Sequence, residues 1–122
     1  MYSMKKILVV DDEENIQLLY QEELNQAGFQ TITAKNGDEA LLLFNKAKPD
    51  LVTIDLKMEG MDGFELLNKI RELDMEIPII IVTAYGEYKQ DFNVWASDAY
   101  ITKSSDPSEL VNTIKGILSR SE

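Results

Sequence analysis

The sequence predicts an α/β fold in which five strands form a parallel sheet and five helices cover its two faces. Short runs of β-branched and aliphatic residues alternate with longer segments of helical period, the pattern of βα units around a parallel sheet. Four of the apolar runs also end at polar residues, which are Asp11, Asp55, Thr83 and Lys103. A chain of 122 residues is long enough for one core and too short for two, so one domain over 1–122 is expected.

The first half of the chain supplies three strands and two helices. The first strand is expected at Lys6–Val10, the second at about 29–33 and the third at 51–54. Gly28 is expected to end the first helix, because glycine most readily adopts the left-handed conformation that follows a helix. Pro49 is expected to end the second helix, which covers about 36–47. The apolar face of the first helix contains Ile16, Leu19, Tyr20, Leu24 and Ala27, and that of the second Ala40, Leu41, Phe44 and Ala47.

The second half supplies two strands, ending at Thr83 and at Thr102, and three helices at about 63–73, 88–96 and from 107 onward. Asp106 is a good N-cap for the last helix, with Pro107 in the first turn and Glu109 placed to close a capping box. The inward face of this last helix is expected to contain Leu110, Val111, Ile114, Ile117 and Leu118.

The composition excludes several classes of function. A net charge of -10, from 22 acidic and 12 basic residues, repels nucleic acid phosphate, so no nucleic acid partner is expected. The apolar runs are too short to cross a bilayer, so no membrane contact is expected. The chain has no cysteine for a disulfide framework, and no apolar signal segment precedes the first strand. A cytoplasmic location is therefore expected.

The polar strand ends predict a phosphoryl-transfer site. Ligands of open parallel sheets bind at the carboxyl ends of the strands, where Asp11, Asp12 and Asp55 should lie close together. At about 4 Å and an effective dielectric of about 20, each like-charge contact costs roughly 4 kcal/mol, so a cation should occupy the cluster. Mg2+ suits these oxygen ligands, Mn2+ is possible, and Zn2+ would favour histidine or cysteine, both absent. Lys103 would add a positive charge from the other side and Thr83 a hydroxyl group, which makes Asp55 a phosphate acceptor.

Each of these residues alone has an ordinary structural explanation, since paired aspartates after a strand commonly cap a helix. The occurrence of all these residues at the ends of the strands favours the phosphoryl-transfer site. With its ordered motifs, the chain resembles a response-regulator receiver domain from Lys5 to about Leu118. The resemblance implies the flavodoxin-like three-layer (βα)5 receiver fold with strand order 2-1-3-4-5. The matching segments are Val9–Glu13, Ala34–Leu41, Pro49–Val52, Asp55–Met58 with Gly60–Gly63, Pro78–Gly86 and Tyr100–Lys103.

The resemblance also implies a role for each site residue. Asp55 would accept a phosphoryl group from a sensor histidine kinase or a phosphotransfer protein, and Lys103 would contact the phosphoryl oxygens. Thr83 and Tyr100 would switch a surface made by the helix at 88–96, the strand before Lys103 and the last helix. The chain would be a phosphoacceptor signalling protein of a two-component system or phosphorelay rather than an enzyme. The Mg2+ ligands would be Asp11, Asp12, Asp55 and the backbone carbonyl of Lys57.

The chain departs from the family pattern in three places. Ser104 follows the lysine and Glu59 precedes Gly60, where the family usually has proline in both positions. The segment between Thr83 and Lys103 is about two residues shorter than usual, so we expect a remodelled output face and a monomer. With no effector domain expected, the downstream partner would be an unidentified protein. The candidates for docking a kinase, again by resemblance, are Asn15, Ile16, Leu19 and Ser104.

Three other functions stay open at this stage. The chain could act as a protein-interaction module that needs no phosphorylation. An aspartate-nucleophile phosphohydrolase of the haloacid dehalogenase type would need a second aspartate where Lys57 stands. A flavodoxin-like flavin carrier would need a hydroxyl-rich phosphate loop after the first strand, where the acidic residues from Asp11 onward would repel a phosphate.

Overall fold

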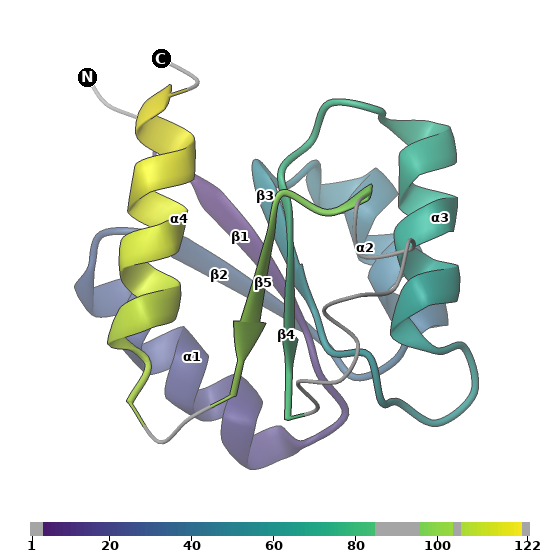
Figure 1. The fold of residues 1–122 in the computed structure, drawn as a ribbon, viewed down its shortest axis with the longest axis horizontal. Coiled ribbons are helices and arrows are strands. Elements are labelled where there is room, and N and C mark those ends of the chain that lie inside the picture. Colours follow the sequence, from purple (N-terminus) through teal and green to yellow (C-terminus); the bar gives the residue numbers. More distant parts are fainter. Residues whose placement is uncertain (1–3, 85–95, 104–105, 121–122) are drawn as a thin grey trace.

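A computed structural model of the protein describes residues 4–84, 96–103 and 106–120. In these residues a five-stranded parallel sheet lies between two layers of helices (Figure 1). The strand order β2-β1-β3-β4-β5 confirms the expected topology. The strands are β1 (Lys6–Val10), β2 (Gln30–Ala34), β3 (Leu51–Ile54), β4 (Ile79–Thr83) and β5 (Ala99–Thr102). The helices are α1 (Glu14–Gln26), α2 (Gly37–Ala47), α3 (Gly63–Leu73) and α4 (Ser108–Arg120).

The sequence prediction and the structure agree closely on the elements. β2 begins one residue later than expected, and α4 begins at Ser108 rather than at Pro107. The helix predicted at 88–96 falls almost entirely on 85–95, which lie outside the described residues. None of the helices in the described segments combines the length and the apolar character needed to cross a bilayer.

Two apolar cores lie on opposite faces of the sheet, because successive strand side chains point to opposite sides. In β1, Ile7 and Val9 pack toward α1 and α4, whereas Leu8 and Val10 pack toward α2 and α3. Figure 1 shows the same division, with α1 and α4 on one side of the sheet and α2 and α3 on the other. The central strands β3 and β4 are buried along their whole length. Apart from the buried Thr53 and Thr83, their residues are all apolar, without the alternation of a half-exposed strand.

Local signals set several helix ends. Gly28 follows α1 with a φ of 97°, the left-handed conformation for which glycine was expected there. Asn36 caps α2 by accepting from the Glu39 amide at 2.8 Å, and Asp62 caps α3 by accepting from the Glu65 amide at 2.9 Å. The Asp106 side chain accepts from the Ser108 amide at 2.9 Å. Asp106 thus stands at the start of α4 as predicted.

At the amino ends of the strands, two aspartates make the same pair of bonds. The Asp50 carboxylate accepts from the Lys6 amide at 2.7 Å, and the Asp50 amide donates to the Lys6 carbonyl at 2.8 Å. The Asp98 carboxylate accepts from the Ile79 amide at 2.8 Å, and its amide donates to the Ile79 carbonyl at 2.7 Å. Arg71 of α3 adds an ion pair of 3.1 Å to Asp98. Both pairs of neighbouring strands, β1–β3 and β4–β5, are thereby joined where they begin.

Candidate functional site

The carboxyl ends of β1, β3 and β5 bring three charged residues to one edge of the sheet. Asp11 follows β1, Asp55 follows β3 and Lys103 follows β5. The ends of β1 and β3 are level because Val10 is in register with Ile54. β5 ends two residues further along, since Ile54 is in register with Ile81 and Ile81 with Tyr100. A cleft of about 340 Å³ opens at this edge and is lined by Asp12, Glu13, Asp55, Lys57, Ala84 and Lys103.

The Lys103 ammonium group lies between the two buried carboxylates. Its Nζ is 2.8 Å from Oδ2 of Asp11 and 3.1 Å from Oδ2 of Asp55. Asp11 is 2% exposed, Asp55 is 4% exposed, and the Lys103 side chain is 12% exposed. The sequence predicted a lysine that faces the carboxylates across the site, whereas the structure places the ammonium group in direct contact with both. One cation thus compensates part of the negative charge of the cluster.

Burial and ion pairing act in opposite directions on these groups. Burial raises the pKa of Asp11 and of Asp55, and the attraction of Lys103 offsets that rise only in part. Burial on its own would lower the pKa of Lys103, but its hydrogen bonds and charge attraction to the two aspartates outweigh burial and raise that pKa. Lys103 therefore stays protonated, and its positive charge favours the ionised form of both carboxylates.

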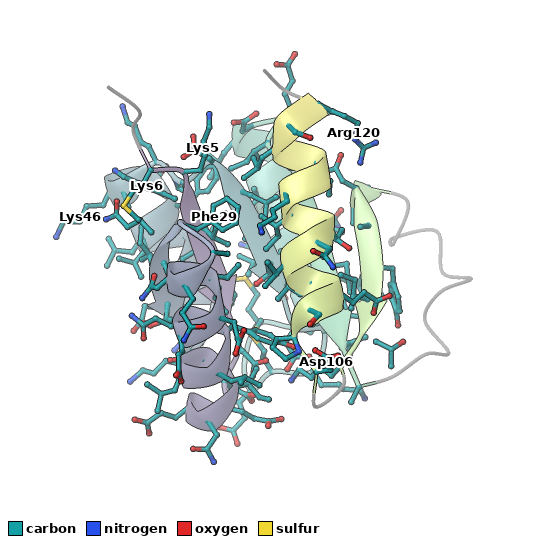
Figure 2. All side chains as sticks on the ribbon, turned by 90° about the vertical axis from the view of Figure 1, so that its left-hand side faces the viewer. Lys5, Lys6, Phe29, Lys46, Asp106 and Arg120 are labelled. Atoms are coloured by element: carbon teal, nitrogen blue, oxygen red, sulfur yellow. The ribbon has the colours of Figure 1, made fainter. Side chains whose placement is uncertain are left out.

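Four carboxylates converge at the mouth of the cleft. One oxygen each from Asp11, Asp12, Glu13 and Asp55 can be chosen so that all lie within 4.8 Å of one another. Asp12 and Glu13 are exposed, and Lys103 Nζ lies 3.7 Å from the Glu13 carboxylate. Oxygen ligands of this kind, partly open to water, fit a hard divalent cation such as Mg2+. Figure 2 shows Lys5, Lys6 and Lys46 at the end of the molecule opposite this acidic cluster, where β1 begins.

The loop that carries Asp55 is held tightly against the start of α3. The Asp55 Oδ1 accepts from the Lys57 amide at 3.2 Å, and the Gly63 amide donates to the Leu56 carbonyl at 3.1 Å. A Cβ atom on Gly63 would lie 2.5 Å from the Asp55 carbonyl oxygen and 2.6 Å from the Leu56 Cα. Real Cβ contacts essentially never fall below 3.0 Å. A residue without a side chain is therefore required here, at the backbone of the candidate phosphate acceptor.

Thr83 and Tyr100, the two residues predicted to form the switch, do not line the cleft. Thr83 is fully buried at the end of β4, and its carbonyl accepts from the Lys103 amide at 2.7 Å. Ala84, the next residue, lines the cleft. Tyr100 is half-buried and packs against the core on the α2 and α3 side.

The predicted docking residues of α1 lie apart from the cleft lining. Asn15 is exposed, whereas Ile16 and Leu19 are half-buried and pack against the core beneath α1 and α4. Ser104 lies outside the described residues.

Sequence reasoning missed three residues that shape the site. Glu13 directly follows the paired aspartates, so its place in the cluster could have been found from its position. Gly63 stood in a matching motif, but the close approach that requires it depends on tertiary packing. Gln17 of α1 donates from Nε2 to the Asp11 carbonyl at 2.5 Å, and no sequence signal distinguishes it from the other glutamines of the chain.

Comparison with known proteins supports one family. The model of the response regulator receiver domain matches residues 7–115. Sporulation initiation phosphotransferase F of Bacillus subtilis is 40% identical over 116 residues, which cover 93% of this chain and 94% of that protein. The alkaline phosphatase synthesis transcriptional regulatory protein PhoP of the same species is also 40% identical, over 120 residues that cover 97% of this chain. The chain spans only 50% of the length of that relative.

Solved structures agree with this assignment. The response regulator protein TrrA from Thermotoga maritima, in complex with Mg2+-BeF, has 44% sequence identity and a TM-score of 0.89, covering 93% of this chain and 98% of that one. The same regulator in complex with the histidine kinase ThkA gives 44% identity and a TM-score of 0.88, covering 94% of this chain and 99% of that one. From the polar strand ends, the strand order and the extent of these matches, we conclude that the chain belongs to the response regulator receiver domain family.

Proposed function

We propose that the chain accepts a phosphoryl group on Asp55 in a Mg2+-dependent reaction and passes the signal on through protein contacts. One observation carries the proposal: Asp55 is buried at the edge of a cleft, with the Lys103 ammonium group 3.1 Å from its carboxylate. Such a carboxylate is an oxygen nucleophile beside a fixed positive charge, the arrangement that phosphoryl transfer needs.

The transfer forms one bond and breaks another. An oxygen of the ionised Asp55 carboxylate attacks the phosphorus atom as the phosphorus–nitrogen bond of a donor phosphohistidine breaks, and the imidazole leaves with the electron pair. Lys103 would hold an oxygen of the incoming group, because its ammonium group already lies beside the attacking carboxylate. Ala84 lines the cleft with a small side chain and leaves room for that group.

Asp11, Asp12 and Asp55 would hold Mg2+, with the Lys57 carbonyl as a further ligand, and Mn2+ is a possible substitute. The clustering of carboxylate oxygens within 4.8 Å and the absence of histidine and cysteine support this choice of metal. When bound, the ion would supply positive charge to the phosphoryl oxygens. In the solved complex of the TrrA regulator, Mg2+ is bound together with BeF.

Phosphorylation would bias a switch through Thr83 and Tyr100. Thr83 stands beside the cleft-lining Ala84, and Tyr100 packs on the opposite face of the sheet from α4. The predicted output surface also includes 88–95, outside the described residues. A Thr83→Ala variant should still accept phosphate on Asp55 but should lose the phosphorylation-dependent change in the amide NMR spectrum around β5. An unchanged spectral response would argue against this switch.

The partners would be a histidine kinase or a phosphotransfer protein upstream, with docking through Asn15, Ile16 and Leu19 of α1 and through Ser104. The net charge of -10 supports a protein rather than nucleic acid as the downstream target, in the cytoplasm. Asn15→Ala should slow phosphotransfer from a protein donor and leave phosphorylation by a small molecule unchanged. We also propose a monomer, acting as one domain, and sedimentation of the phosphorylated chain as a dimer would contradict this.

The deciding experiment is the intact mass of the chain after incubation with a small-molecule phosphodonor and Mg2+. A single phosphoryl adduct is expected, and it should be absent from Asp55→Asn and from an EDTA control. No adduct on the folded wild-type chain would favour an interaction module that works without phosphorylation. An adduct that persists in Asp55→Asn would place the acceptor elsewhere.

A further inference from the structure

We propose that Gln17 is a positioning residue for the cation site, acting through the peptide that joins Asp11 to Asp12. The inference rests on the proposed function, in which these two aspartates hold Mg2+. Gln17 lies on α1, half-buried, and does not line the cleft itself. It would therefore act on the ion without touching it.

The Gln17 side chain reaches the carboxyl edge of the sheet. Its Nε2 lies 2.5 Å from the Asp11 carbonyl oxygen and 3.4 Å from the Ala34 carbonyl oxygen. Both neighbours are acceptors, so the amide must present its nitrogen and not its oxygen to them. The Asp11 amide donates to the same Ala34 carbonyl at 3.0 Å. The side chain thus joins the ends of β1 and β2 directly beside the acidic cluster.

The two aspartates differ in what holds their carboxylates. The Asp11 carboxylate accepts from the Glu13 amide at 2.9 Å and pairs with Lys103 at 2.8 Å. Across the described residues, no hydrogen bond or ion pair is found for the exposed Asp12 carboxylate. The reach of this carboxylate is therefore limited by the position of the Asp12 Cα atom, which the preceding backbone sets.

That backbone is the peptide unit which Gln17 holds. A peptide unit is planar, so fixing the Asp11 carbonyl also fixes the direction of the Asp12 amide and Cα atom. The Gln17 bond therefore limits where the Asp12 carboxylate can lie relative to those of Asp11 and Asp55. Residues that orient metal ligands from outside the ligand set commonly change metal affinity by about 10–100-fold when they are replaced.

The test compares variants of the full chain by calorimetric titration of the metal-free protein with Mg2+, at a temperature at which every variant is folded. Gln17→Met keeps the length of the side chain and removes the donor. Gln17→Asn keeps the amide but is one methylene too short to reach Asp11. Gln21→Met is the matched control, since no side-chain hydrogen bond of Gln21 occurs within the described part of the chain.

Both Gln17 variants should weaken the Kd for Mg2+ by about tenfold, whereas Gln21→Met should stay within about twofold of wild type. The Asp12 amide should also shift in the NMR spectrum of the metal-free Gln17 variants. A purely structural role would lower the thermal midpoint in EDTA and leave the Kd unchanged, and that result would overturn the inference.

Asp12→Ala distinguishes a failure of the proposed cation site from a failure of the positioning role of Gln17. If it binds Mg2+ as tightly as wild type, the proposed cation site itself is wrong. If it loses Mg2+ while both Gln17 variants keep wild-type affinity, the proposed function stands and the positioning role of Gln17 fails.

Discussion

A methyl group added at Gly63 should destabilise the protein and disturb the Asp55 loop. The new Cβ would lie 2.5 Å from the Asp55 carbonyl oxygen, so the loop and α3 must separate by at least 0.5 Å to reach the 3.0 Å limit of real contacts. The opposing atoms are backbone, which yields less readily than the end of a flexible side chain. Overpacking of this kind costs about 1–3 kcal/mol, more than alanine gains over glycine in a helix, about 1 kcal/mol at most.

Urea denaturation measures the effect. With a slope of about 1–2 kcal/mol per M, a loss of about 2 kcal/mol lowers the unfolding midpoint of Gly63→Ala by roughly 1–2 M. The matched control is Gly116→Ala in α4, where the new Cβ would meet no atom within 4 Å. That control should gain about 0.5–1 kcal/mol, because alanine loses less conformational entropy on folding.

Gly63→Ala should also accept phosphate on Asp55 more slowly than Gly116→Ala, in the intact-mass assay with a small-molecule phosphodonor. A Gly63→Ala midpoint equal to or above that of wild type would refute the reasoning, because it would mean that the loop moves without cost. Normal phosphorylation of a clearly destabilised Gly63→Ala variant would show that the packing of the Asp55 loop affects stability but not phosphorylation.

Three further predictions concern the charges of the site. Mg2+ at ten times its Kd should raise the free energy of unfolding by about 1.4 kcal/mol, and Asp12→Ala should raise the stability of the metal-free protein while abolishing this response in thermal melts. The raised pKa values of Asp11 and Asp55 mean that the folded state binds protons more readily than the unfolded state. Their contribution to stability is therefore largest at low pH and is lost as the pH rises through the raised values, so Asp11→Asn should reduce the gain seen on acidifying the metal-free protein from neutrality. Lys103→Met leaves two buried carboxylates without their cation and should cost about 3 kcal/mol near neutral pH in urea denaturation, less as the pH falls.

Each of these predictions has an outcome that contradicts it. A melting midpoint of Asp12→Ala that still rises with Mg2+ would place the ion elsewhere. If acid changed the stability of wild type and of Asp11→Asn equally, Asp11 would not titrate differently in the folded and the unfolded state. A Lys103→Met variant as stable as wild type at neutral pH would show that water or counterions compensate the two carboxylates.

The sequence allowed the fold and the position of Asp11, Asp55 and Lys103 at one edge of the sheet to be predicted, because both depend on local pattern. An apolar run that ends at a polar residue places that residue at the carboxyl edge of a parallel sheet, which accounts for Asp11, Asp55 and Lys103. The direct contact of Lys103 with both aspartates depends on how three chain segments meet in space, and no local pattern encodes it. The same holds for Gly63 and Gln17, whose roles come from one backbone distance and one side-chain contact.

The paired bonds of Asp50 and Asp98 at the amino edge bear on how this fold tolerates change in evolution. Each aspartate holds the first residue of a neighbouring strand, Lys6 or Ile79, and so opposes a slip of strand register. A slip of one residue would turn every side chain of a strand to the wrong face and would displace the residue that follows the strand. Because alignment is maintained at the end remote from the cleft, the loops at the carboxyl edge are free to diverge toward new partners and new phosphate lifetimes. Substitutions of Asp50 and Asp98 should therefore lower stability at a distance from the cleft, whereas changes at Gly63 and Lys103 should affect both stability and signalling.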